Sequence, residues 1–350
     1  MKHTSETSDR EGAGGGARAE SSSTFRPSRW LPGGHAQTIF GTLLRAFPRP
    51  RTTRERWDLP DGDFVDVDLL AAPAGAPSIL LLHGLEGSAR SHYVRGMLAL
   101  AGRHGLQAFA LNFRSCSDEP NRLLRSYHSG ETEDLGFAVQ RVLARTAGPL
   151  LLCGFSLGGN VLVKWLGEQG AGVPDRIAAA AAISVPFDLA ACAAALDGPG
   201  AMSWAYRERF LRTLKKKAIA KASAFPGLDP AKVAATRTLG QFDEVVTAPV
   251  HGFADAADYW RRSSSGPYVA RVRVPLLLVS AIDDPIVPGG GLPPDRFAGN
   301  PLVTLEATEQ GGHVGFVTGP PWAPRFWAED RAMEFFSLRL EDRQKQASAP

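Results

Sequence analysis

The stretch PLLLCGFSLGGN, residues 149–160, predicts a buried strand that turns sharply into a helix. Its apolar run, 150–153, has the length of a core strand. The run leads into GFSLG, residues 154–158, which has the form G-x-S-x-G. Such a turn holds its serine in a strained backbone conformation, and a Cβ on either flanking glycine would clash. The pattern therefore indicates that the Ser156 hydroxyl lies at a helix N-terminus, where free N–H groups favour negative charge.

Strands and helical segments alternate on both sides of this stretch. Such alternation is typical of βαβ units and a mostly parallel sheet flanked by helices. Buried strands are predicted near 78–82, 107–112, 150–153, 177–185, 274–280 and 302–305, and helices near 92–104, 129–143, 157–169 and 325–340. Residues 54–59 and 63–70 flank Pro60-Asp61-Gly62, and apolar residues alternate with acidic ones in the second segment. This alternation predicts a β-hairpin with one face toward water.

The alternation stops between residues 186 and 270, where five helix-like segments follow without a clear strand. We interpret this segment as a helical cap over the site, inserted between two parts of one α/β core, 25–185 and 271–341. Residues 1–24 are rich in Gly, Ser, Glu and Arg and predict a disordered tail, and 342–350 predict a frayed one. The apolar segment 25–48 is expected to pack on the body as an arm, the alternative being that Trp30 and residues 35–38 lie near the site.

Composition excludes several classes of protein. The chain has 350 residues, of which 44% are hydrophobic and 21% charged, as in ordinary globular proteins. A net charge of +3, with scattered arginines, does not indicate a nucleic-acid partner. Three widely spaced cysteines predict neither a disulfide framework nor a metal site. No apolar run reaches the length of a membrane span and no signal peptide is recognised, so we expect a cytoplasmic protein without a stable membrane anchor.

A base and an acid for Ser156 follow two later strands. A serine hydroxyl is a poor nucleophile until an imidazole removes its proton, and a carboxylate must orient that imidazole. Asp283 and Asp284 follow the strand that ends at Ser280, and His313 lies in GGHVGF after the last predicted strand. The chain order serine, acid, histidine is that of an α/β-hydrolase. We choose Asp284 as the acid because it begins the turn D-x-I-V-P; Asp283 is the alternative and is expected to shape the loop.

Two backbone N–H groups are candidates for an oxyanion hole, which a tetrahedral intermediate requires. Leu157 follows the serine directly, and Leu85 lies in the loop His83-Gly84-Leu85 after a core strand. His83 is expected to brace that loop, and we favour this role over a catalytic one. Glu86 is expected to line the pocket or to brace the same loop.

Two other polar clusters are given structural roles. Residues 114–122 and 128–133 are expected to brace loops and cap a helix, ahead of contacting substrate. The basic segment 204–221 predicts a solvated helix face, ahead of docking on an anionic membrane. His251 has no evident partner in the sequence and is left unassigned.

Six motifs together resemble one known family. The stretches LLLHGLEGS, NFRSCSDEPNR, YHSGETEDL, GFSLGGN, HGFADAADYW and GGHVGF are similar to the YheT-like branch of the α/β-hydrolases, the AB hydrolase-4 family. The resemblance covers about residues 25–340. It implies an α/β-hydrolase fold and a serine esterase with Ser156, Asp284 and His313 as its triad. The family also includes eukaryotic ABHD proteins related to monoacylglycerol and phospholipid hydrolysis.

The expected activity is hydrolysis of a carboxylic ester through an acyl-enzyme, without a metal or organic cofactor. The expected partner is a small ester with a short- to medium-chain acyl group or a glycerol ester. Five aromatic residues of the cap motivate the hydrophobic acyl group: Phe187, Trp204, Phe210, Phe253 and Trp260. Two alternatives stay open, an acyltransferase that uses the same acyl-enzyme and a catalytically silent binding module. The sequence does not indicate an oligomeric state.

Overall fold

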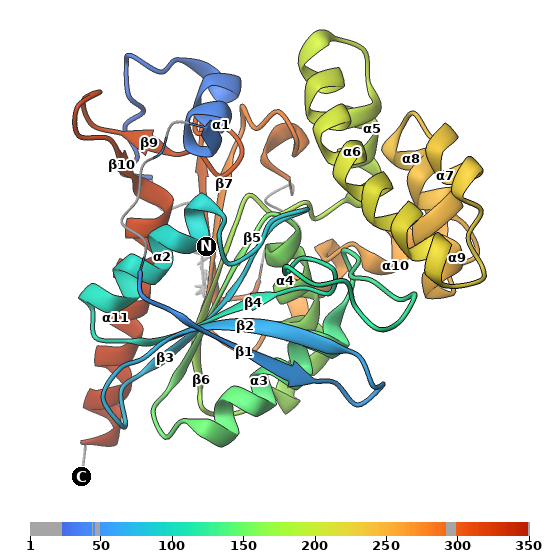
Figure 1. Ribbon diagram of the computed structural model, residues 1–350. Helices are drawn as coiled ribbons and strands as arrows, with labels where there is room; N and C mark the ends of the chain where they lie inside the picture. Colours follow the sequence, from blue (N-terminus) through green and yellow to red (C-terminus); the bar gives the residue numbers. More distant parts are fainter. Residues whose placement is uncertain (1–22, 44, 46–49, 292–298, 349–350) are drawn as a thin grey trace, which may run out of the picture.

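The computed structural model describes residues 23–43, 45, 50–291 and 299–348 (Figure 1). The predicted tail therefore lies almost wholly outside the described residues, as do 349–350. The strands are β1 Thr53–Asp58, β2 Phe64–Leu70, β3 Ser78–Leu82, β4 Gln107–Asn112, β5 Leu150–Phe155, β6 Ile177–Ile183, β7 Leu276–Ala281, β8 Val303–Thr308, β9 Val317–Thr318 and β10 Arg325–Phe326. The helices are α1 Gly33–Leu43, α2 His92–Arg103, α3 Thr132–Arg145, α4 Leu157–Gln169, α5 Leu189–Asp197, α6 Ala201–Ala224, α7 Pro230–Ala235, α8 Leu239–Phe242, α9 Ala248–His251, α10 Ala256–Ser263 and α11 Trp327–Ala347.

One eight-stranded sheet in the order β1-β2-β4-β3-β5-β6-β7-β8 forms the centre of the molecule. Neighbouring strands pair in parallel along β4-β3-β5-β6-β7-β8. The pairs β1–β2 and β2–β4 are antiparallel. The prediction of a mostly parallel sheet flanked by helices is confirmed. Because parallel strands end at the same edge, the loops after β3, β5, β7 and β8 all leave the sheet on one side.

Helices cover both faces of the sheet, which is why its central strands are apolar on both sides. Helices α2 and α11 lie on one face and α3 and α4 on the other (Figure 1). Each face has its own buried apolar cluster, the first around Met97 and Phe336 and the second around Trp57 and Leu162. Strand β5, which leads into Ser156, is fully buried between the two clusters.

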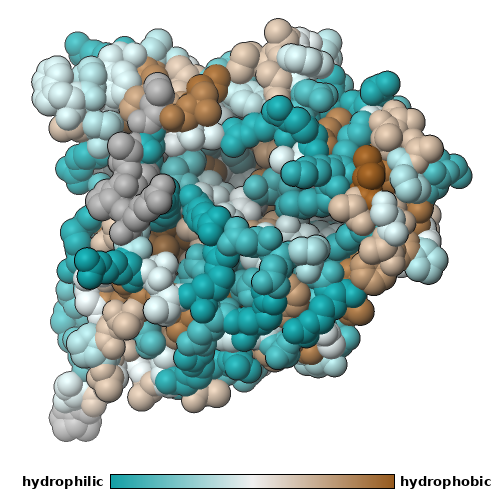
Figure 2. Space-filling model, in the orientation of Figure 1, coloured by the Kyte–Doolittle hydropathy of each residue, from teal (hydrophilic) through white to brown (hydrophobic). Residues whose placement is uncertain are grey.

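The β1–β2 hairpin is confirmed, but the prediction that one face of it is wet is wrong for β2. Asp66 and Asp68 are 3% and 8% exposed because arginines of β1 cover them. Arg54 donates to Asp68 at 2.6 Å and Arg56 donates to Asp66 at 2.9 Å. Cross-strand ion pairs thus replace water over the acidic side chains, and the surface over this hairpin is hydrophilic (Figure 2).

Between β6 and β7 the described chain contains the helices α5 to α10 and no β-strand. They gather beyond the carboxyl ends of the parallel strands (Figure 1). A third apolar cluster, which includes Leu196, Leu211, Val233 and Phe242, holds them together. These helices correspond to the predicted segment 186–270, and its boundaries as a separate cap unit stay a prediction.

The last helix is longer than predicted. It begins at Trp327 and ends at Ala347, seven residues beyond the predicted end at 340 and through most of the segment predicted to fray. The extra turns are rich in residues that favour helix, and Arg343 donates to the Asp175 carbonyl at 2.6 Å. Among the described residues, no helix is long and apolar enough to cross a membrane.

A buried arginine ties the hairpin to α3. Both Arg114 and Asp134 have side chains only 2% exposed, and Arg114 donates to both Asp134 oxygens at 2.7 and 2.6 Å. Arg114 also donates to Asp61 at 2.6 Å, and Asp63 lies 3.4 Å away. The predicted bracing role of this polar loop is therefore correct for Arg114.

We predict that Arg114→Met lowers the free energy of unfolding by about 3–5 kcal/mol, because it leaves buried carboxylates without their counter-charge. Urea denaturation followed by tryptophan fluorescence measures the loss. The matched control is Arg145→Met, whose pair with Glu55 is more than one-third exposed and is expected to contribute less than about 1 kcal/mol. Equal losses in the two variants would contradict the prediction.

Candidate active site

Ser156 stands in the turn between β5 and α4 with φ 52° and ψ −123°, a conformation that is strained for a residue with a side chain. The predicted steric reason for the flanking glycines is confirmed. A Cβ on Gly154 would lie 2.5 Å from the Gly158 carbonyl oxygen, and one on Gly158 would lie 2.4 Å from the His83 carbonyl oxygen. Only glycine at both positions lets the turn close this tightly.

The structure brings Ser156, His313 and Asp284 into one hydrogen-bonded chain. His313 Nε2 lies 2.8 Å from Ser156 Oγ, and His313 Nδ1 lies 2.8 Å from Asp284 Oδ2. The other Asp284 oxygen accepts the backbone N–H groups of Ile286 and Val287 at 2.8 and 3.0 Å. Since a carboxylate only accepts, the imidazole carries a proton on Nδ1 and presents a lone pair on Nε2 to the serine.

Asp283, the alternative acid, makes a different contact. Its Oδ1 accepts the Gly312 N–H at 2.9 Å, next to His313. Burial is the main reason that the pKa of Asp283 is raised. The arrangement fits the expected loop-shaping role, and it leaves the imidazole to Asp284.

The N-terminal arm also holds the histidine loop, a role that the sequence interpretation did not favour. Thr38, on α1, accepts the His313 N–H through Oγ1 at 2.8 Å. Gln37 accepts the Val317 N–H at 2.6 Å, and a Cβ on Gly312 would lie 2.3 Å from the Gly34 carbonyl oxygen. The GGHAQT stretch therefore lies against the site as well as packing on the body. Its Gly34 was the signal that the sequence offered, because a Cβ there would lie 1.9 Å from the Asp283 carbonyl oxygen.

The loop after β3 is braced as predicted. His83 is fully buried, and burial lowers its pKa to about 4, so the ring is neutral. Its Nε2 accepts the Phe113 N–H at 3.1 Å, and its Nδ1 therefore donates to the Gly84 carbonyl at 2.8 Å. On either side of Leu85, the Gly84 and Glu86 N–H groups donate to the hydroxyls of Tyr93 and Tyr127 at 2.9 and 2.7 Å.

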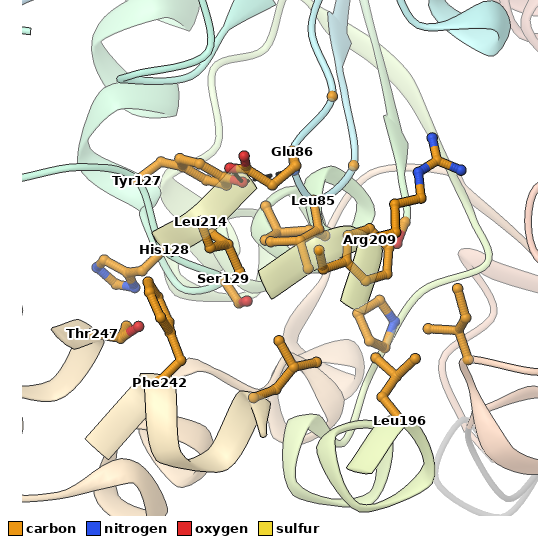
Figure 3. Close-up of a pocket in the computed structure, with 18 of the residues that line it drawn as sticks. Leu85, Glu86, Tyr127, His128, Ser129, Leu196, Arg209, Leu214, Phe242 and Thr247 are labelled. Carbon is orange, nitrogen blue, oxygen red and sulfur yellow. Dashed lines mark hydrogen bonds between the residues drawn. The ribbon is translucent and has the colours of Figure 1, made fainter. Parts of the chain in front are cut away.

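Ser156 and His313 line a cavity of about 450 Å³. Figure 3 shows part of its wall, including Leu85, Leu196 and Phe242. Most of its apolar wall comes from the segment between β6 and β7, through Leu196, Leu214, Leu228, Leu239, Phe242 and Val246. The five aromatic residues proposed for this role fit it only in part. Phe210 and Trp260 line the cavity, whereas Trp204 is 58% exposed and Phe187 and Phe253 are not among the lining residues. Aliphatic side chains supply the rest.

The basic helix α6 is not simply a solvated face, which corrects that prediction for two lysines. Lys217 donates to Glu86 at 2.9 Å, and Lys221 donates to the carbonyl oxygens of Leu123 and Leu124 at 2.8 and 3.2 Å. Burial lowers the pKa of Lys221 to about 8. Their i, i+4 spacing puts both on one face of the helix, and this face meets the body.

His251, unassigned from sequence, lies beside His128 and Glu131, and the three offer ligand atoms within 4.8 Å of one another. They do not fit a metal. His128 Nδ1 accepts the Gly130 N–H at 3.1 Å, so the neutral ring carries its proton on Nε2, toward Glu131. Arg125 already donates to both Glu131 oxygens, at 2.9 and 2.8 Å. A metal ion would have to displace these protons.

Asn160, the last residue of the opening stretch, joins three segments at the back of the site. It is fully buried, donates to the carbonyls of Ser129 and Ser263, and accepts the Ser265 N–H at 2.9 Å. Tyr259 accepts the Ser129 N–H at 3.0 Å. The helix that follows Ser156 is thereby fixed to the end of α10 and to the loop before α3.

Comparison with known proteins finds similar chains. A family model of the α/β hydrolase fold matches residues 77–320. The chain is 38% identical over 330 residues to the candidate esterase YheT of Escherichia coli (strain K12), covering 92% of this chain and 95% of that protein. It is 28% identical over 324 residues to the phospholipase ABHD3 of Homo sapiens, covering 89% and 78%. A solved esterase of Pyrococcus furiosus superposes with a TM-score of 0.56 at 17% identity, over 85% of this chain and 96% of that one, and shares the fold.

We predict that Thr38→Val destabilises the histidine loop, because valine keeps the shape but leaves the partly buried His313 N–H without this acceptor. The expected loss is about 1–3 kcal/mol in the free energy of unfolding, with faster hydrogen exchange in 311–317. Thr42→Val is the control, since the Thr42 hydroxyl only donates to a carbonyl within α1, at 3.0 Å. Similar exchange in both variants would show that Thr38 does not hold the loop.

Proposed function

Since the chain belongs to the α/β-hydrolase family, in its YheT-like branch, we propose that it is a serine carboxylesterase with Ser156 as nucleophile, His313 as base and Asp284 as acid. The observation that carries the proposal is the unbroken hydrogen-bonded chain from Asp284 through His313 to Ser156, 2.8 Å at each link. Such a chain, at the carboxyl ends of parallel strands and beside a cavity, meets the geometric requirements for nucleophilic acyl transfer.

In the first half of the reaction, Ser156 Oγ attacks the ester carbonyl while His313 Nε2 takes its proton. The imidazolium that forms keeps its Nδ1 proton toward Asp284, which stabilises the charge without accepting the proton. The tetrahedral intermediate then collapses, the bond to the alcohol breaks, and His313 Nε2 returns the proton to the departing alkoxide. The acyl group is left as an ester on Ser156.

In the second half, water replaces the alcohol. His313 takes a proton from water, whose oxygen attacks the acyl-enzyme carbonyl, and the same proton then returns to Ser156 Oγ as the acid leaves.

The Leu85 and Leu157 N–H groups are the proposed oxyanion donors. Leu157 is the first residue of α4, where helix geometry leaves the N–H without an intrahelical acceptor and the dipole is positive. Leu85 lies between two N–H groups that already donate to tyrosine hydroxyls. Two fixed donors at the carbonyl oxygen supply the electrostatic stabilisation that such reactions require.

The proposed substrate carries a hydrophobic acyl group of short to medium length. The aliphatic wall of the cavity supports this choice, because burying a methylene there is favourable by about 0.8 kcal/mol. A phospholipase among the relatives is in keeping with an ester that has an apolar acyl chain.

We predict that Ser156→Ala lowers kcat by at least about 10⁴-fold and Asp284→Asn by about 10⁴-fold, with the fold intact. Ester hydrolysis and labelling of Ser156 by a fluorophosphonate probe measure both effects. Asp283→Asn is the matched variant, because asparagine still accepts the Gly312 N–H. Its kcat is expected to fall far less than that of Asp284→Asn. A larger loss in Asp283→Asn than in Asp284→Asn would exchange the two roles.

A second prediction concerns acyl length. Phe242→Ala removes a ring from the cavity wall and should move the preferred ester to a longer acyl chain, whereas Leu196→Trp should move it to a shorter one. The kcat/KM values across esters from acetate to palmitate measure the shift, and product analysis with added alcohols detects any acyl transfer. An unchanged length profile in both variants would place the acyl chain elsewhere.

A further inference from the structure

A lysine of the cap reaches the loop that carries a proposed oxyanion donor. Lys217, on α6, donates to Glu86 Oε1 at 2.9 Å, and the two residues are 131 positions apart in the chain. The Glu86 side chain is only 6% exposed, so a nearby cation stabilises its carboxylate. Both side chains line the cavity beside Ser156.

Glu86 follows Leu85 directly and has a left-handed backbone with φ 54°. Such a conformation costs a non-glycine residue of order 1–3 kcal/mol unless its surroundings hold it. Here Tyr127 holds it twice, because its hydroxyl accepts the Glu86 N–H at 2.7 Å and donates to Glu86 Oε1 at 2.9 Å (Figure 3). The Tyr127 hydroxyl thus binds both the Glu86 side chain and the peptide N–H that directly follows Leu85.

Lys217 completes this cluster from the side of the cap. Its ammonium lies 3.6 Å from Cys116 Sγ and 5.9 Å from the centre of the Tyr127 ring. It therefore supplies the positive charge beside the Glu86 carboxylate on the cavity side. Without it, that carboxylate would keep only the Tyr127 hydroxyl among the residues that the structure describes, and water would be needed to solvate the charge.

Helix α6 also has anchors on the body that do not involve this loop. Tyr206 lies 3.1 Å from His35 Nδ1 through its hydroxyl, and Lys221 donates to the carbonyls of Leu123 and Leu124. The helix thus remains docked at two other points if Lys217 is replaced. An effect of Lys217 on the reaction can then be separated from undocking of the cap.

We propose that Lys217 is a positioning residue: through Glu86 it holds the Leu85 loop in the conformation that completes the oxyanion hole, and it links that conformation to the docked cap. The inference rests on the proposed esterase function. In this proposal the cap has two roles: it forms a wall for the acyl group, and through Lys217 it helps to position the Leu85 N–H.

The test compares Lys217→Met with Lys216→Met, a control at the exposed neighbouring lysine of the same helix. Misaligning one oxyanion donor should lower kcat by about 10- to 100-fold, somewhat less than deleting it, while KM changes little. Affinity for a trifluoromethyl ketone, which forms a tetrahedral adduct on Ser156, should fall by a similar factor. Affinity for the unreactive alcohol of the same shape should not fall.

Two further variants keep the test decisive if Lys217→Met is poorly folded. Lys217→Arg retains the charge and should restore most of kcat. The double variant Glu86→Gln/Lys217→Met removes the buried charge together with its partner. Its fold-loss in kcat should be smaller than the product of the fold-losses in kcat of the two single variants.

The inference is overturned if Lys217→Met matches Lys216→Met in kcat, or if the ketone and the alcohol lose affinity equally. If either result is obtained while the wild-type enzyme hydrolyses the esters, only the role of Lys217 is rejected and the proposed function stands. A wild-type protein that neither hydrolyses the ester series nor labels at Ser156 would instead overturn the proposed function, and this inference with it.

Discussion

The proposed active site depends on one hydrogen bond, between Ser156 Oγ and His313 Nε2, which joins residues 157 positions apart at 2.8 Å. Neither residue can reach the other by local structure. The sheet supplies the approximate meeting place, because β5, β7 and β8 end at one edge, but strand ends alone do not set a distance to a fraction of an ångström. The loops do this, and most of the polar contacts around the site belong to loops that are fixed from two sides.

Those contacts are made by segments distant in sequence. The histidine loop is held by α1 through Thr38 and by the strand-end residue Asp283. The serine helix is held through Asn160 to the end of α10, and the loop after β3 is held by two tyrosines. The backbone N–H groups of Gly84, Glu86 and His313 each have a defined side-chain acceptor. These contacts pre-organise the loops that carry the site, and pre-organised geometry is what the proposed acyl transfer needs.

Buried charge is used in the same way. Arg114 joins the hairpin to α3, and Lys217 joins α6 to the loop beside Leu85. A buried ion pair contributes little net stability, yet breaking it is costly, so it fixes the relative position of the segments that carry its two partners. Ion pairs also explain two corrected expectations, through Arg54 and Arg56 over β2 and through Lys217 on α6. Because they are charged, the acidic face of β2 and the basic face of α6 were expected to face water. In the structure, the first face and part of the second contact side chains of opposite charge.

The sequence by itself determined the parallel sheet, the serine turn and the candidate residues Ser156, Asp284 and His313, because strand periodicity, glycine sterics and chain order are local properties. It also indicated that Asp283 and His83 would shape loops. Only the tertiary structure decided that Thr38 holds the histidine loop, that His251 lies beside His128, and that Lys217 faces inward onto Glu86. Each of these depends on which surfaces of distant segments meet, and a charged or polar side chain has the same local pattern whether its partner is water or a residue a hundred positions away.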